Sequence, residues 1–211
     1  MLGARRRAPT RQRTRVTPGP SLNRSDDGRT PSLTESAQAG RWGNAYGAGI
    51  TQEEPPVSPN VVFREVNEQT LEAVLAVTLA PEQEPYVGSV SEALEEARET
   101  PEGKPWYRAV FDGELAVGFV MLNWNVPPNP PEIIGPWYVW KLIVDRRYQG
   151  RGYGRAIIEK VVEIVRAEGA ETLLTSYALG PDNPGPFYRR VGFSPTGDVN
   201  IDGEVIVALE L

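Results

Sequence analysis

The apolar residues from position 61 onward recur with the spacings of strands and helices. Asp112-Gly113 joins two β-rich runs, which is a strong signal for a hairpin with a tight turn. The segment 125–136 carries five prolines and is expected to be a loop. Runs rich in β-branched and aromatic residues predict six strands, over residues 61–65, 106–111, 114–124, 138–145, 172–177 and 204–209.

Four segments have the features of helices. Asn67 is a good N-cap for a first helix, with Leu71, Val74, Leu75 and Thr78 on one face. Ser89 to Glu92 has the S-x-x-E form of a capping box and opens a second helix, with Leu94 and Ala97 inward. A third helix spans 155–167 and ends at Gly169, and a fourth begins late, at Pro186. The third helix should bury the stripe formed by Ile157, Ile158, Val161, Val162 and Val165.

These elements follow one another in the order β-α-α-β-β-β-α-β-α-β. That order predicts a domain of the α/β class over residues 59–211.

Residues 1–58 differ from the rest in composition. They are rich in Arg, Ser, Thr, Pro and Gly and carry a net charge of +4, against −10 for residues 59–211. Without an apolar face to bury, this segment is expected to be a disordered extension. Its Arg clusters leave open a nucleic-acid arm or a transit peptide, beside a solvated extension or a start codon assigned too far upstream.

The composition excludes several kinds of chemistry. The chain has no Cys and no His, which removes a thiol nucleophile, a thiolate metal site and the commonest general base. No metal site is therefore expected. No apolar run reaches the roughly 18 residues that span a membrane, so a soluble cytoplasmic protein without a membrane partner is expected. The acidic domain favours a cationic partner and makes nucleic acid an unlikely ligand of the domain.

The glycine-rich run Gln149–Arg155 lies between a predicted strand and a predicted helix. The free amides of a first helical turn, together with the helix dipole, bind anions, and glycines let a ligand approach the backbone. Arg151 and Arg155 add positive charge. No Gly-Lys-Ser/Thr follows, so a P-loop is excluded, and the spacing G-x-G-x-G departs from the dinucleotide fingerprint despite the acid Glu171 downstream. The run predicts a phosphate site.

The pattern Q-x-x-G-x-G, read from Gln149, resembles the pyrophosphate loop of the GNAT superfamily of acyl-CoA-dependent N-acyltransferases. Tyr188, followed four and five residues later by Gly192-Phe193, is similar to a second motif of that family. The resemblance covers roughly 150 of 211 residues. It implies the GNAT fold, a mixed sheet with helices on its faces that the predicted element order matches, and acetyl-CoA as co-substrate. The cofactor would be bound by residues Leu142, Ile143, Val144, Gln149, Gly150, Arg151, Gly152, Tyr153, Gly154, Arg155 and Asn183.

The resemblance also implies the chemistry. Tyr188 would protonate the departing CoA thiolate, and the amine would attack directly in a ternary complex, since the chain lacks Cys and a Ser-His pair. The segments 79–87 and 91–95 are similar to bacterial polyamine acetyltransferases, which implies a small cationic amine as acceptor. Acceptor-binding candidates are Glu82, Glu84, Tyr86, Trp137 and Trp140.

Several alternatives stay open. The base could be Glu82, Glu84, Glu132 or a chain of waters. The acceptor could instead be a protein N-terminus, a Lys side chain or an aminoglycoside, or the chain could be a non-catalytic acetyl-CoA-binding regulator. A homodimer is also possible.

Overall fold

The computed structural model of this protein describes residues 59–130 and 132–211. The predicted disordered extension, residues 1–58, lies outside them. The described residues form one sheet in the order β1-β2-β3-β4-β5-β7-β6. Its strands are β1 Val61–Arg64, β2 Pro105–Asp112, β3 Leu115–Asn123, β4 Tyr138–Val144, β5 Thr172–Tyr177, β6 Ser194–Val199 and β7 Val205–Glu210. The helices are α1 Leu71–Leu75, α2 Glu84–Val87, α3 Val90–Glu99, α4 Tyr153–Ala167 and α5 Gly185–Arg190, with a short 3-10 turn, η1, at Pro101–Gly103.

The predicted mixed α/β architecture is confirmed, with two additions and one correction. The additions are α2 and β6, neither of which the sequence pattern had indicated. The correction concerns the first helix. It begins at Leu71 with Thr70 at its N-cap, and both Leu71 and Leu75 are exposed, so that only Val74 of the predicted face is buried. Asn67 accepts a bond from the Gln69 amide in the preceding turn instead of capping the helix.

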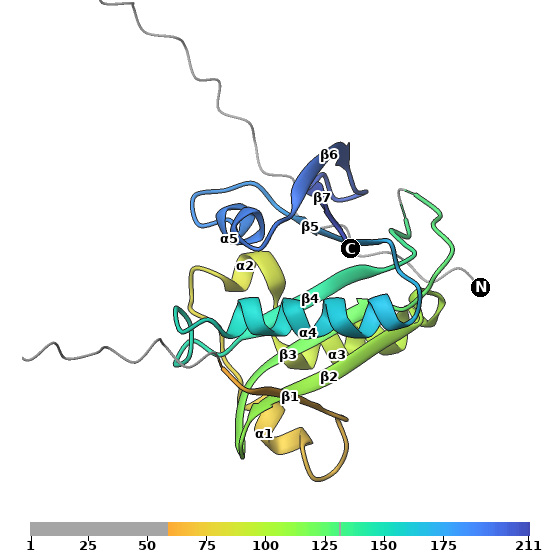
Figure 1. Ribbon diagram of the computed structural model, residues 1–211. Coiled ribbons are helices and arrows are strands. Elements are labelled where there is room, and N and C mark those ends of the chain that lie inside the picture. Colours follow the sequence, from red (N-terminus) through yellow and green to blue (C-terminus); the bar gives the residue numbers. More distant parts are fainter. Residues whose placement is uncertain (1–58, 131) are drawn as a thin grey trace, which may run out of the picture. The chain divides into compact units, whose positions relative to one another are not determined.

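Helices cover both faces of the sheet, as Figure 1 shows, and each face has its own core. On one face α4 buries Ile157, Ile158, Val161 and Val165 against β3, β4 and β5. On the other face α1 and α3 pack on residues of β2, β3 and β4. The capping box of α3 forms as predicted, with Ser89 and Glu92 exchanging hydrogen bonds. β4 is the central strand of the sheet, and its side chains enter the cores on both faces.

The contact between β4 and β5 is the irregular part of the sheet. These two strands run parallel and pair only at Tyr138↔Leu174 and Val139↔Thr175. On the other side, β4 pairs with β3 along its length, apart from a bulge at Trp140, which has no partner between Val139 and Lys141. A bulge bends a strand and often ends its pairing. Beyond Trp140, β4 therefore separates from β5 and leaves a slot between them.

Candidate active site

A cavity of about 900 Å3 occupies the slot between β4 and β5. Its wall includes Trp140, Leu142 and Val144 of β4, and Thr175, Ser176 and Tyr177 of β5. The loop before α4 closes one end, and residues of α2, α5 and the β6–β7 turn complete the lining. The cavity therefore exists because the two parallel strands part after two residue pairs.

The free edge of β4 faces this cavity. Successive residues of a strand direct their N–H and C=O groups to alternate edges. The Asp145 amide bonds to Val117 on β3, so Val144 and Leu142 direct their backbone groups the other way, toward the slot. The Gln149 side chain bonds to the Val144 carbonyl at 2.9 Å, as that orientation requires. Such an edge can accept an extended ligand as an additional strand.

The N-terminus of α4 opens into the same cavity. Gly152 is the N-cap, and no side chain among the described residues caps the helix. Gly150 and Gly152 have φ values of 74° and 89°, which other residues rarely adopt. The first-turn residues Tyr153, Gly154 and Arg155 line the cavity. Free amides, the dipole of a 15-residue helix and a guanidinium make this end suitable for an anionic group.

Two polar side chains hold the glycine-rich loop in place. Gln149 Nε2 donates to the Val144 carbonyl and, at 2.6 Å, to Gln83 beside α2. The fully buried Asp145 carboxylate accepts bonds from the amides of Thr78 and Arg147 and from the Arg147 guanidinium. Burial raises the pKa of Asp145, but these hydrogen bonds outweigh it and leave the pKa below its usual value. Both contacts tie the loop to the α1–α2 segment.

Tyr188 lies on α5 and lines the cavity. It is 7 % exposed and packs against Tyr177, Phe187 and Phe193. Burial raises the pKa of its hydroxyl, and the charge of Glu204 adds to the rise, while a hydrogen bond with Thr175 opposes it. The phenol therefore stays protonated near neutral pH and can act as a proton donor. As predicted, α5 starts late, with proline in its first turn.

The cavity lining also includes a polar network that the sequence analysis missed. Ser176 Oγ bonds to Glu204 and, at 2.7 Å, to the Tyr138 hydroxyl. Asn200 Nδ2 bonds to both Ser176 Oγ and Glu204 Oε2. Burial raises the pKa of Tyr138 to about 12. These residues come from β4, β5 and the β6–β7 turn, so no local sequence pattern could have united them.

Most of the predicted cofactor residues meet in the cavity. Leu142, Val144, Gln149 and the loop from Gly150 to Arg155 line it, with the exception of Arg151. The Arg151 guanidinium lies 5.7 Å from the Tyr148 ring centroid instead. Ile143 is 1 % exposed, with its side chain in the core on the α1 and α3 face, so it presents no group to the slot. Asn183 lines the cavity, but both polar atoms of its side chain already have partners. Its Nδ2 donates to the Gly180 carbonyl, and its Oδ1 accepts from the amide of Gly185, the first residue of α5.

The predicted acceptor residues divide into two groups. Tyr86 and Trp140 line the cavity. Glu82 and Glu84 are exposed and lie outside the lining, whereas Gln83 and Tyr86 of the same segment face inward.

Two other candidates from the sequence also lie outside the cavity. Trp137, the residue before β4, is 4 % exposed and packs edge-on against Trp124 in the core on the α4 face. Glu132, proposed as a base, is exposed in the loop before β4.

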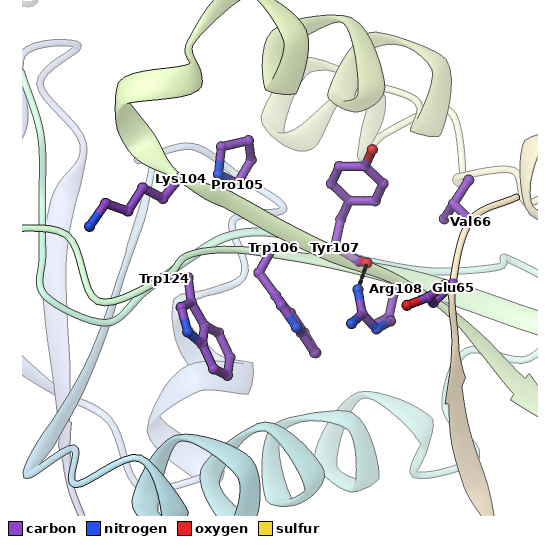
Figure 2. A pocket seen from close by; sticks show the side chains of 8 residues that line it. All are labelled: Glu65, Val66, Lys104, Pro105, Trp106, Tyr107, Arg108 and Trp124. Atoms are coloured by element: carbon purple, nitrogen blue, oxygen red, sulfur yellow. Dashed lines mark hydrogen bonds between the residues drawn. The ribbon is translucent and has the colours of Figure 1, made fainter.

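A second hollow, of about 510 Å3, lies along the start of β2 (Figure 2). Trp106 and Trp124 stack there at 5.2 Å, and the Arg108 guanidinium lies 4.5 Å from the Trp106 ring centroid. Neither the glycine-rich loop nor Tyr188 reaches it. No helix N-terminus is in its lining, so of the two hollows the β4–β5 cavity has the groups suited to binding phosphate and transferring a proton.

Within residues 59–130 and 132–211, no group of three or more Asp or Glu side chains is arranged to hold a metal ion. None of the helices in this part of the chain is both long and apolar enough to cross a membrane.

Comparisons with known proteins agree with this geometry. The sequence profile of the Acetyltransferase (GNAT) family matches residues 71–193, which is more than half of the chain. A Bacillus subtilis spermine/spermidine N(1)-acetyltransferase is 25 % identical over 155 residues, covering 72 % of this chain and 99 % of that protein.

Solved structures share the fold. A GNAT-family protein from Desulfovibrio desulfuricans has a TM-score of 0.51 and 24 % identity, covering 71 % of this chain and 98 % of that one. An aminoglycoside 6'-N-acetyltransferase complexed with coenzyme A also has a TM-score of 0.51, with 16 % identity over 71 % of this chain and 96 % of that one.

Proposed function

Because this chain belongs to the Acetyltransferase (GNAT) family, and is therefore an acyltransferase that uses acetyl-CoA, we propose that its acceptor is a small cationic primary amine. The amine resembles a polyamine or diamine. It attacks the thioester directly while both substrates are bound.

One observation carries this proposal. The free edge of β4 and the uncapped N-terminus of α4 open into the same cavity as the Tyr188 hydroxyl. The pyrophosphate of CoA would rest on the amides from Gly150 to Arg155. The pantetheine arm would extend along β4 and pair with the backbone of Val144 and Leu142. This path leads the thioester from the loop toward Tyr188, so that binding orients it for attack.

Tyr188 is proposed as the acid that protonates the leaving thiolate. A phenol has an ordinary pKa of about 10 and a thiol of about 8.5, so the thiolate is a weaker base than the phenolate. The raised pKa of Tyr188 widens this difference but keeps the donor fully protonated. Without Cys, and without His to activate a Ser, the chain offers no ready nucleophile for an acetyl-enzyme.

The proposal of a cationic acceptor is supported by the charge of the domain and by sequence similarity. The segment 59–211 carries a net charge of −10, which attracts a polyvalent cation. The Bacillus subtilis relative is named for spermine and spermidine and is matched over almost its full length. The alternatives are an aminoglycoside, a protein N-terminus or a Lys side chain. A cytoplasmic location and a homodimer stay predictions.

The test measures release of free CoA by the full chain with a panel of acceptors. Spermidine, spermine and a diamine are compared with an aminoglycoside, a Lys-containing peptide and a reaction without acceptor. We expect kcat/KM for spermidine to exceed that for the peptide by about tenfold or more, a difference of roughly 1.4 kcal/mol in the barrier. A preference for the peptide or the aminoglycoside would assign the acceptor differently. CoA release that no amine stimulates would contradict the proposal altogether.

A further inference from the structure

The acceptor amine arrives protonated, and its attack requires a base. A primary alkyl ammonium resembles Lys, with a pKa of about 10.4. The chain has no His or Cys, so a carboxylate is the natural candidate. Four acids line the cavity: Glu96, Asp182, Asp202 and Glu204. Glu96 is paired with Lys141 at 2.9 Å, and the two aspartates are exposed.

Glu204 differs from the other three in being held by neutral groups. Its Oε2 accepts hydrogen bonds from Ser176 Oγ and from Asn200 Nδ2. Asn200 is itself fixed, because its Oδ1 accepts the amides of Asp202 and Glu204 at 3.0 and 2.9 Å. Within the described residues, Oε1 of Glu204 has no hydrogen-bond partner. One oxygen is thus anchored while the other can bind a ligand.

The hydrogen bonds have a single consistent direction. The ionised carboxylate only accepts, so the one proton of Ser176 goes to Glu204. Ser176 must then accept from Tyr138, whose pKa of about 12 keeps it protonated. A chain of donors therefore ends at the carboxylate and stabilises it without neutralising its charge.

Glu204 also lies close to the proposed acid. Its charge contributes to the raised pKa values of both Tyr138 and Tyr188, which face it from β4 and α5. The other charged side chains of the lining near α5 and the β6–β7 turn are Asp182, Arg190 and Asp202. A thioester delivered along β4 toward Tyr188 would thus have an acid and a carboxylate in the same part of the cavity.

We propose that Glu204 binds the acceptor ammonium and removes its proton, and that Ser176 and Asn200 are positioning residues for this base. The inference rests on the proposed function. It names a base, which the candidates predicted from the sequence do not supply, because Glu82, Glu84 and Glu132 lie outside the cavity lining.

In the proposed transfer, the amine nitrogen loses two protons and gains the acetyl group. Glu204 takes one proton from R–NH3+ and later passes it to solvent. The nitrogen lone pair forms the C–N bond at the thioester carbonyl, and the C–S bond breaks. Sulfur keeps the electron pair and takes the phenolic proton of Tyr188. The second proton lost by nitrogen restores the phenol, so the products are the amide, CoA–SH and one proton.

The test is Glu204→Gln, which keeps the shape of the side chain and removes its basicity. With spermidine at pH 7, we expect kcat/KM to fall by about 10²-fold or more. With 2,2,2-trifluoroethylamine, which is already neutral at pH 7, the same substitution should change kcat/KM by less than about threefold. With spermidine, the loss should also shrink as the pH approaches the pKa of the amine. A merely structural role would reduce both rates equally.

Two further variants complete the test, one as a control for charge and one as a replacement for Glu204→Gln. Asp198→Asn removes an acidic charge from the exposed strand β6, outside the cavity lining, and should leave both rates within about threefold of wild type. If Glu204→Gln does not fold, Ser176→Ala replaces it, with a smaller loss on spermidine and none on the neutral amine. Equal losses on the two amines, or no loss on spermidine, would overturn the inference. Because wild-type turnover of spermidine is measured alongside, these outcomes are distinguishable from failure of the proposed function.

Discussion

The two edges of β4 show how one strand can serve both stability and function. Its edge toward β3 is paired from Tyr138 to Val144, with one bulge, and Asp145 continues that pairing. Its edge toward β5 is paired at two residues only. Where β4 pairs with β3, a hydrophobic core covers each face of the sheet. The edge of β4 toward β5 borders a cavity of about 900 Å3.

The difference arises from one local feature. Trp140 is the bulged residue, and pairing with β5 ends one residue before it. Leu142 and Val144 stand in regular register with β3, but their own N–H and C=O groups point to the other edge, toward the slot. Pairing with β3 holds the backbone groups that face the slot in a fixed geometry. This favours binding, because the strand loses little conformational entropy when a ligand pairs with it.

The largest expected effect is in the cavity that the free edge of β4 borders, at Tyr188 of α5. Tyr188→Phe removes one hydroxyl and keeps the ring that packs on Tyr177 and Phe193. If Tyr188 protonates the thiolate, kcat should fall by about 10²–10⁴-fold, with little change in the affinity for acetyl-CoA. Steady-state kinetics with calorimetry measures both quantities.

The matched control is Tyr107→Phe, on β2 and remote from the slot, which should leave kcat unchanged. A Tyr188→Phe enzyme that kept more than about a third of the wild-type rate would contradict the assignment, since the effect of a general acid is far larger.

At the paired edge we expect loss of stability instead of activity. A Cβ on Gly118 would lie 2.4 Å from the carbonyl oxygen of Ile143, closer than β3 and β4 can tolerate without moving apart. Gly118→Ala should therefore destabilise the fold by about 1–3 kcal/mol, seen as a Tm lower by several degrees.

The matched control for this edge is Gly113→Ala in the hairpin turn, where a Cβ meets no atom within 4 Å. It bears only the strain of a positive φ, and its Tm should fall less. Equal shifts in Tm for both variants would show that the close approach of β3 to β4 is not the cause.

The smallest expected effect is at Asp145, where β4 ends. Its folded pKa lies below the unfolded value of about 3.9, so the folded state binds fewer protons. Its contribution to stability is complete above about pH 4 and is lost as the pH falls through the folded value. Asp145→Asn should lower the free energy of unfolding at pH 7 by on the order of 1 kcal/mol, because the Arg147 partner is largely exposed, and by less at pH 3. Urea unfolding at the two pH values measures this, and an equal loss at both would contradict it.

The sequence predicted elements whose signals are local. The capping box of α3 and the bounds of β5 agree with the structure, because each depends on a few adjacent residues. β6 was missed because its residues, Ser-Pro-Thr-Gly-Asp-Val, are all exposed and lack alternation; it is a strand because β7 offers an edge to pair with. The first helix was misjudged because Leu71 and Leu75, though apolar, are on its exposed side.

In the site, too, the part with a local sequence signal could be predicted, and the part assembled by strand pairing could not. The loop from Gln149 to Arg155 has a motif that can be read without the fold. Ser176 and Glu204 come together only through the pairing of β5 with β7, in which Ser176 stands opposite Ile206. Trp137 and Trp140 are the same residue type in one short segment, but Trp137, just before β4, packs in the core, whereas Trp140, at the bulge of β4, lines the cavity.

The most direct test of the account follows the backbone amides by NMR while acetyl-CoA is added to the full chain. The amides of Leu142 and Val144 and those of the loop from Gly150 to Arg155 should show the largest shift changes, since they would bond to the pantetheine and the pyrophosphate. The amides of Trp106, Arg108 and Trp124, in the second hollow, should change little. Large changes in the second hollow with an unperturbed β4 would contradict the claim that the free edge of β4 binds the cofactor.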